Sequence, residues 1–289
     1  MTPYSHCFQK PCQPLEEVVW LYVQQNVSFL NISVTQRLVA KAVPFLGFFF
    51  GDKPLVRHDL EGTAVRTPLA LLIGPQTKPD MELDLSGNSF ECFSIVFQPD
   101  GLYKLFGFPV HEITNGIADA ASVLGAQASR MGELLGNCRT FEERVECSNQ
   151  WLLDIYKNSR CSEGISAILS RILRSRGEDR IEAMFRQTGL SKSTFERRFR
   201  EQIGMSAKLF SRIVRFQAAL DLKARSPRSS WTYIAQECGY FDQMHLIHDF
   251  GEFTATCPQE ALRSVERIYG DSLHAIDVGN AKLPDSLLL

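Results

Sequence analysis

A short basic segment, TGLSKSTFERRFREQIG at residues 188–204, carries side chains whose types and spacing could bind an anion. Phe195 and Phe199 are four residues apart, so in a helix they would lie on one face. The opposite face would present Lys192, Ser193, Glu196, Arg197 and Arg200. Ammonium and guanidinium groups form charge-assisted hydrogen bonds with anionic oxygens. We therefore expect the phenylalanines to hold the helix on its domain while the polar face meets an anionic partner.

The position of this helix follows from a pattern that occurs twice. MFRQTGLSKSTFERRF (184–199) and IAQECGYFDQMHLIHDF (234–250) each contain the end of an apolar-faced helix, a glycine, a polar stretch and a second helix with two inward apolar residues. Gly189 and Gly239 suit a turn that needs a left-handed backbone. Two short helices joined by such a turn are typical of the helix-turn-helix, whose second helix enters the major groove of DNA.

A single long helix is expected between the two units, over the 19 residues 207–225. Its length would be about 28 Å. That separation suits two recognition helices in successive major grooves, which are about 34 Å apart. Packed helix pairs often imitate one helix-turn-helix unit, so two copies at this separation are a stronger indication of DNA binding than one.

Residues 179–263 resemble the AraC family of bacterial transcription regulators. The resemblance rests on GLSKSTFERRFREQIGMS, RFQAALDL, YIAQECGYFDQMHLIHDF and Pro258. It implies base-facing positions in the first unit at Ser193, Glu196 and Arg197. In the second unit the implied positions are Gln243, Met244, Ile247 and His248.

These residue types suit base recognition in different ways. Arg197 could form a bidentate pair with guanine, Gln243 suits adenine, and Glu196 could accept a hydrogen bond from cytosine. Other basic residues of the first unit and the linking helix are expected to contact phosphates, which set the register of a protein on DNA. They are Lys192, Arg200, Lys208 and Arg212.

The second unit departs from the family pattern. His248, Asp249, Gly251 and Glu252 stand in a stretch where the family usually carries basic residues. Because carboxylates repel phosphates, we expect this unit to bind DNA more weakly or with a looser sequence preference. The whole stretch 165–270 still has 17 Lys and Arg against 12 Asp and Glu, whereas the rest of the chain has 14 against 21. The basic part is therefore the part expected to face a polyanion.

The N-terminal half has a different periodicity. Between residues 15 and 98, short β-branched and aromatic runs alternate with turn sequences, which predicts a small antiparallel β-barrel-like (cupin-like) domain or a sandwich. Helices are expected to follow at 117–135 and 141–156, and a polar linker at 157–164. The predicted class is α+β, with a sensor and dimerisation domain at 1–160, an all-α DNA-binding domain at 165–270 and a tail at 271–289.

An apolar stripe on the second of these helices has two interpretations. It consists of Phe141, Val145, Leu152 and Ile155, with Trp151 loosely on the same face. Such a stripe could pack on its own domain, or it could form a contact between two copies of the chain. We expect the stripe to form the contact between two copies of the chain.

The combined features predict a sequence-specific DNA-binding transcription regulator rather than an enzyme. The expected partners are double-stranded DNA, a small-molecule effector at the N-terminal domain, RNA polymerase if the protein is an activator, and a second copy of the chain. No cofactor or metal is expected, because a cupin metal site needs several histidines and the strand region offers His58, with His6 and His111 at its margins. The alternatives are a protein-interaction module with a degenerate DNA-binding domain and, less favoured, a metal-dependent cupin-type enzyme.

A cytoplasmic location is expected. The N-terminus lacks the pattern of a signal peptide, and the apolar run near residues 45–50 is far shorter than the roughly 20 residues that span a bilayer. The eight cysteines include no C-x-x-C pair, which favours reduced thiols.

Overall fold

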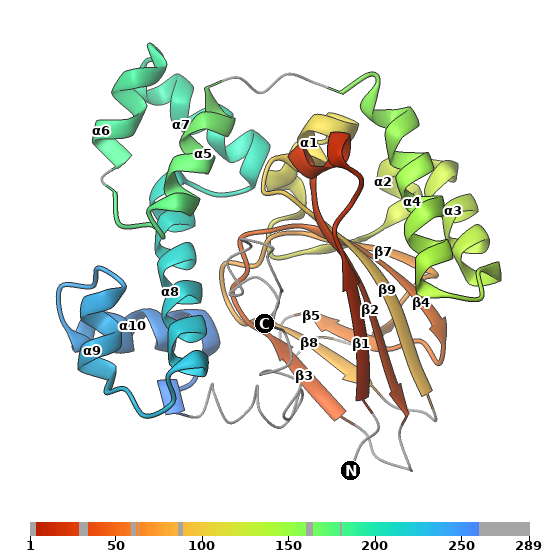
Figure 1. Ribbon diagram of the computed structural model, residues 1–289, viewed down its shortest axis with the longest axis horizontal. Coiled ribbons are helices and arrows are strands. Elements are labelled where there is room, and N and C mark those ends of the chain that lie inside the picture. Colours follow the sequence, from red (N-terminus) through yellow and green to blue (C-terminus); the bar gives the residue numbers. More distant parts are fainter. Residues whose placement is uncertain are drawn as a thin grey trace.

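The computed structural model describes residues 4–28, 34–58, 62, 64–85, 89–159, 164–179 and 181–259. An N-terminal sheet domain with trailing helices is followed by a helical domain (Figure 1). The predicted α+β class is therefore confirmed. The expected tail at 271–289 lies outside the described residues.

In the described residues of the sheet domain, ten strands form two antiparallel sheets. The six-stranded sheet has the order β1-β2-β9-β4-β7-β10, and the four-stranded sheet has the order β3-β8-β5-β6. The strands are β1 (Tyr4–Gln9), β2 (Val19–Ser28), β3 (Val34–Leu38), β4 (Phe45–Gly51), β5 (Leu55–His58), β6 (Val65–Arg66), β7 (Ala70–Ile73), β8 (Met81–Leu85), β9 (Ser89–Phe97) and β10 (Ile117–Asp119).

The two sheets bury a shared apolar layer. Phe49 and Leu71 of the larger sheet join Val56 and Met81 of the smaller one in a single cluster of buried side chains. In β8 the buried and less buried residues alternate, as expected for a strand with one face in the core. The arrangement is barrel-like without being a closed barrel, since the sheets are joined by packing and by one isolated bridge between Lys41 and Gln76.

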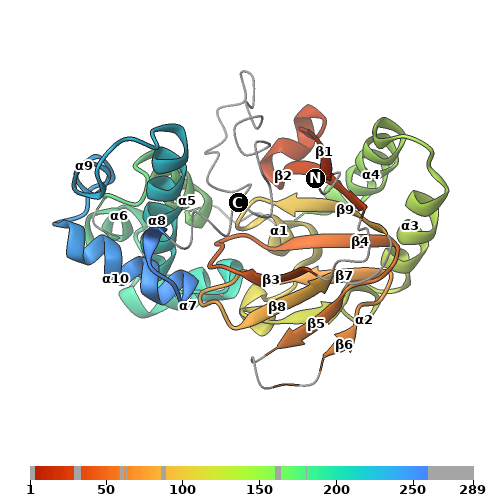
Figure 2. The same ribbon diagram turned by 90° about the horizontal axis from the view of Figure 1, so that it is seen from below.

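Short helices cover the other face of the larger sheet (Figure 2). They are η1 (Gln13–Glu17), α1 (Gly101–Phe106), η2 (Val110–Ile113), α2 (Ala120–Leu124), α3 (Ala126–Asn137) and α4 (Phe141–Tyr156). Phe141, Val145 and Leu152 of α4 are buried in the same cluster as Tyr22 and Phe93 of the sheet. The stripe is thus buried in the core of its own domain. The expectation that it forms the dimer contact is therefore wrong.

The helix expected over 117–135 is also wrong in part. Its first residues form β10, which pairs with β7, and two helices follow. The Asp119 side chain accepts a hydrogen bond from the Ala121 backbone N–H and so starts α2. Gly125 then separates α2 from α3, because its φ of 81° and ψ of 177° cannot continue a helix.

The helical domain is built around one long central helix. Its elements are α5 (Ile165–Arg174), α6 (Ile181–Phe185), η3 (Arg186–Thr188), α7 (Lys192–Ile203), α8 (Ala207–Arg225), α9 (Trp231–Glu237) and α10 (Gln243–Thr254). The 19-residue helix α8 has the predicted bounds and lies between the α6–α7 pair and the α9–α10 pair (Figure 1). No described helix is long and apolar enough to cross a membrane.

Contacts join the two domains. Ala40 and Ala42, which follow β3, belong to the buried cluster of the helical domain. The Ala40 backbone N–H donates to the Phe253 carbonyl at 3.0 Å. Just before the start of α8, the Thr114 hydroxyl donates to the Gly204 carbonyl at 2.8 Å. The end of α7 therefore rests against the sheet domain.

Candidate nucleic-acid interface

The first helix-turn-helix unit consists of α6 with η3, a turn at Gly189 and α7. Gly189 has a φ of 68°, in the left-handed region where a side chain is disfavoured. The Ser191 hydroxyl accepts from the Thr194 backbone N–H at 3.3 Å and caps α7. Gly204 ends the same helix with a φ of 90°. The two glycines that bracket the basic segment therefore supply the turns at either end of α7.

The inner face of α7 is fixed by aromatic packing. Phe195 and Phe199 are buried, with ring centroids 5.7 Å apart, and they continue a row of rings from Phe185 to Phe210. Such packing in a close-packed core holds a helix in one rotational setting. The outward face of α7 is therefore a defined surface.

That surface carries the residues that the sequence assigned to the first unit. Lys192, Ser193, Arg197 and Arg200 are exposed, and Glu196 is half-buried. The Arg197 side chain is 69% exposed, and its nearest carboxylate is that of Glu201, 3.8 Å away. An exposed pair at this distance contributes little, so the guanidinium remains available to a ligand.

The second unit repeats this geometry with different side chains. Gly239 turns with a φ of 67°, and the Asp242 carboxylate caps α10 by accepting from the His245 backbone N–H at 2.8 Å. Leu246 and Phe250 are buried, as the sequence predicted. The helix α10 is therefore fixed on its inner side in the same way as α7.

The outer face of α10 carries the other assigned residues. Met244 and His248 are exposed, whereas Gln243 and Ile247 are half-buried. Ile247 packs against the domain's core. The Gln243 amide oxygen accepts from the Thr232 hydroxyl at 2.7 Å, which leaves its amide N–H groups as donors toward a ligand.

Sequence reasoning missed Phe241. This residue lies between the Gly239 turn and the Asp242 cap, and it is 89% exposed. The sequence signal for it was a large aromatic residue in the turn, outside both helices and so outside their buried faces.

Arg212 of α8 is held by carboxylates of α10. Its Nη2 atom lies 2.6 Å from Asp249 Oδ1 and 2.6 Å from Glu252 Oε2. Burial lowers the pKa of Arg212, but the hydrogen bonds that its guanidinium donates to Glu252 and Asp249 outweigh this effect, so the pKa lies above its ordinary value. The charge that the sequence assigned to a phosphate is thus already paired within the protein. Lys208, one turn earlier, is exposed.

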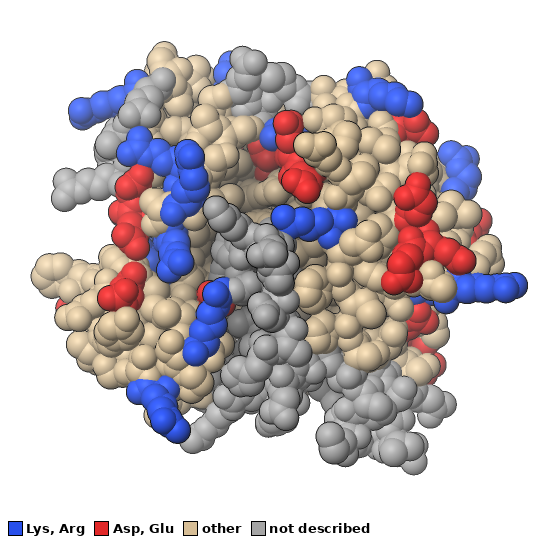
Figure 3. Space-filling view, viewed as in Figure 1, with Lys and Arg blue, Asp and Glu red and all other residues tan. Residues whose placement is uncertain are grey.

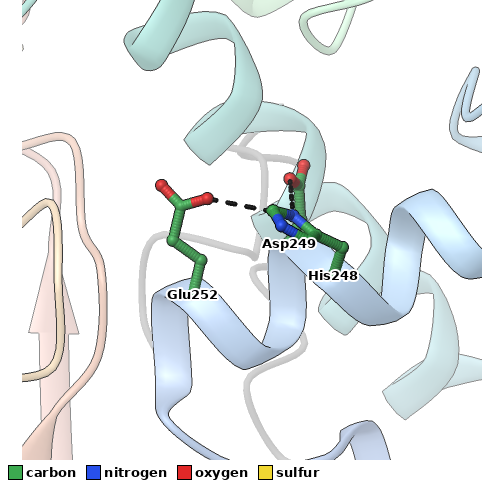
Figure 4. A group of neighbouring side chains, drawn as sticks. All are labelled: His248, Asp249 and Glu252. Carbon is green, nitrogen blue, oxygen red and sulfur yellow. Dashed lines mark ion pairs between the residues drawn. The ribbon is translucent and has the colours of Figure 1, made fainter.

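Among the described residues, one group of side chains has the spacing of metal ligands. His248, Asp249 and Glu252 offer ligand atoms within 4.8 Å of one another (Figure 4). His248 Nδ1 is 4.0 Å from Asp249 Oδ1 and 3.9 Å from Glu252 Oε2. Because both carboxylates already bind the Arg212 guanidinium, we interpret the group as an ion-pair network around that arginine rather than as a metal centre.

Charge is distributed unevenly over the helical domain. On the face shown in Figure 3, Lys and Arg side chains gather over α5 and the upper part of α8, whereas uncharged surface predominates over α9 and α10. Among the described residues 226–259, Arg228 is the one cationic side chain, whereas four are acidic: Glu237, Asp242, Asp249 and Glu252. The second unit therefore offers a polyanion much less attraction than the first.

Two family models match separate parts of the chain. Residues 184–264 match a family described as a helix-turn-helix domain, which is of the AraC type. Residues 8–119 match a domain of unknown function, DUF6597. No curated protein matches the sequence.

Among solved structures, an apo form of a ToxT variant from Vibrio cholerae is 10% identical over 84% of this chain and 97% of its own, with a TM-score of 0.49. Wild-type ToxT from the same organism with an unsaturated fatty acid bound is 10% identical over 89% of this chain and 95% of its own, with a TM-score of 0.46. The AraC-like transcriptional activator CuxR is 13% identical over 99% of this chain and 85% of its own, with a TM-score of 0.33.

Proposed function

We propose that this chain, whose residues 184–264 match an AraC-type helix-turn-helix domain, is a sequence-specific regulator of transcription that reads DNA mainly with α7. The observation that carries the proposal is the outward face of α7. It presents exposed cationic side chains on a helix that Phe195 and Phe199 fix from behind. A rigid helix with such a face fits the major groove.

The side chains of the first unit divide by reach and chemistry. Ser193, Glu196 and Arg197 are the base readers, with Arg197 directed to guanine. Lys192, Arg200 and Lys208 contact phosphates, which fix the register without reading sequence. We expect Arg212 to contribute least to phosphate binding, because Asp249 and Glu252 offset its charge.

The second unit takes the smaller share of the binding energy. Gln243, Met244, Ile247 and His248 are its proposed base-facing residues. Gln243 is oriented by its hydrogen bond with Thr232, and Ile247 is half-buried. The local excess of carboxylates opposes the approach of phosphates. We infer that α10 adjusts specificity more than it adds affinity.

Regulation through the N-terminal domain is the next part of the proposal. The Thr114–Gly204 hydrogen bond ties the end of α7 to that domain, so a small-molecule effector that shifts η2 would act directly on the base-reading helix. A homodimer and, for an activator, contact with RNA polymerase complete the expected partners. The dimer contact must use a surface other than the buried stripe of α4.

A second function is favoured by one observation. Asp249 and Glu252 neutralise Arg212, as they would in a helix-turn-helix domain that has lost DNA binding and serves as a protein-interaction module. The two functions differ in their response to salt, because counterion release occurs when a protein neutralises phosphates.

The test is a set of titrations of the full-length protein against a duplex selected from a random pool and against a scrambled duplex, at several salt concentrations. With three phosphate contacts we expect log K to fall with log salt with a slope of about −3 per chain. Arg130→Ala, which removes an exposed arginine of α3, is the matched control and should leave the slope unchanged. A flat response, or no enrichment from the pool, would reject DNA binding and favour the interaction module.

A further inference from the structure

Two large apolar side chains are exposed at the start of α10. Phe241 is 89% exposed and Met244 is 68% exposed, on either side of the Asp242 cap. A phenylalanine this exposed gains nothing from the protein's own core. The feature lies on the second recognition helix and is continuous with its proposed base-facing positions.

The apolar pair is held in place. The edge of the Phe241 ring packs against His245, with centroids 5.9 Å apart and planes 84° apart. His245 Nδ1 in turn lies 3.2 Å from Asp242 Oδ1, within the cap of the helix. Leu246 and Phe250 anchor α10 from behind, so the backbone that carries Met244 is fixed, and the contact with His245 positions the Phe241 ring beside it.

The surroundings of the pair exclude several ligands. The described part of the second unit has few cations, and Arg212 is engaged by its carboxylates. This surface is therefore poorly suited to phosphates and to the acceptor-rich edge of guanine. An apolar contact in the major groove has a natural counterpart in the 5-methyl group of thymine.

We propose that Phe241 and Met244 read the methyl groups of thymines, so that the second unit recognises a T-containing segment by apolar contact instead of by charge. The inference rests on the proposed function, since it requires the helical domain to dock on DNA. Because α8 separates the two units by about 28 Å, the thymines would lie about one helical turn from the base pair that Arg197 reads.

The experiment uses the full-length protein and a duplex selected from a random pool, in which thymines are replaced one at a time by deoxyuridine. This replacement removes only the methyl group and keeps every hydrogen-bonding group and every phosphate. We expect affinity to fall about fourfold for each methyl group that the pair contacts. Thymines at the Arg197 end of the site should be insensitive to replacement.

Variants assign the effect to the side chains. Phe241→Ala and Met244→Ala should bind the thymine and the deoxyuridine duplexes equally well, and Leu134→Ala, a control at a 48% exposed residue of α3, should keep the parent's preference. Thermal melting checks that each variant folds, which is expected because both side chains are exposed.

Three outcomes would contradict the inference or its premise. If no replacement of thymine by deoxyuridine lowers affinity while binding stays salt-dependent, the inference fails and DNA binding stands. If Phe241→Ala weakens both duplexes equally, the ring has another partner and the inference also fails. If the parent binds no duplex, the proposed function fails with it.

Discussion

Arg197 and Arg212 show how neighbours decide what an arginine can do. Both were assigned to DNA from the sequence, and both lie in the helical domain. Arg197 has one distant carboxylate partner and is 69% exposed, whereas Arg212 is held at 2.6 Å by each of two carboxylates. A guanidinium that is already paired must break those contacts before it can bind a phosphate. The two residues are therefore expected to respond differently to substitution.

Arg197→Ala should weaken binding to a selected duplex by about 1–3 kcal/mol and relax the preference at one base pair. Arg200→Ala, by contrast, should weaken all duplexes alike and lower the salt slope by about one, because we propose that Arg200 contacts a phosphate. Titrations against the selected and scrambled duplexes at several salt concentrations measure both effects. Equal losses for Arg197→Ala on the two duplexes would remove it from the base-reading set.

Glu252→Gln should strengthen binding to every duplex and steepen the salt slope by up to about one. The substitution removes one of the two carboxylates that hold Arg212 and so returns part of its charge to the proposed DNA-facing surface. Glu142→Gln, at an exposed carboxylate of α4, is the control for net charge alone. If the two variants have the same slope, the Arg212 network has no influence on DNA binding.

At the scale of elements, α4 and α7 have similar patterns and different surroundings. Each carries apolar residues on one face, and each begins with a hydroxyl cap, at Thr140 and Ser191 respectively. The apolar face of α4 packs on the larger sheet, in contact with Phe93, whose ring centroid is 6.1 Å from that of Phe141. This burial predicts that α4 contributes to stability and not to assembly.

Leu152→Ala should lower the free energy of unfolding by about 2–5 kcal/mol, because a fully buried leucine leaves a cavity. Leu134→Ala on α3, at an exposed site, should cost little. Denaturant unfolding followed by circular dichroism gives both values, and sedimentation of the folded variants shows the oligomeric state. A Leu152→Ala protein of parental stability and reduced mass would restore the dimer contact at α4.

At the scale of the whole molecule, the two domains share part of their packing. Ala40 and Ala42 enter the core of the helical domain, and Gln217 Nε2 donates to the Ala40 carbonyl at 3.4 Å. The predicted boundaries at 160 and 165 fall between α4 and α5. They stay a prediction, as does the folding of 165–270 on its own. We expect an isolated 165–270 fragment to be helical and less stable than in the full chain, because it loses these contacts. Circular dichroism of the fragment tests this expectation, and an unfolded fragment would contradict it.

Gly204→Ala should destabilise the protein more than Gly189→Ala. Both glycines have a positive φ, so alanine strains the backbone at either site by about 1–2 kcal/mol. At Gly189 an added Cβ meets nothing within 4 Å, whereas at Gly204 it would lie 2.5 Å from Thr114 Oγ1 and 2.9 Å from Pro75 Cγ. Thermal and denaturant unfolding of the two variants compares the costs. Equal costs would mean that the domains can separate at this contact without loss of stability.

The sequence by itself determined the elements whose signals are local. Glycine turns and apolar residues spaced by three or four predicted the bounds of α4 and α8, the buried pairs of α7 and α10, and the matched helix-turn-helix domain. The tertiary structure alone decided what each surface meets. The apolar stripe of α4 could have packed on a sheet or on a second copy of the chain, since both partners bury the same pattern of residues. Residues 117–119 pair with β7, a contact that no local pattern encodes. Arg212 lies 37 residues from Asp249 in the chain, so its ion pair followed only from the way α10 packs on α8.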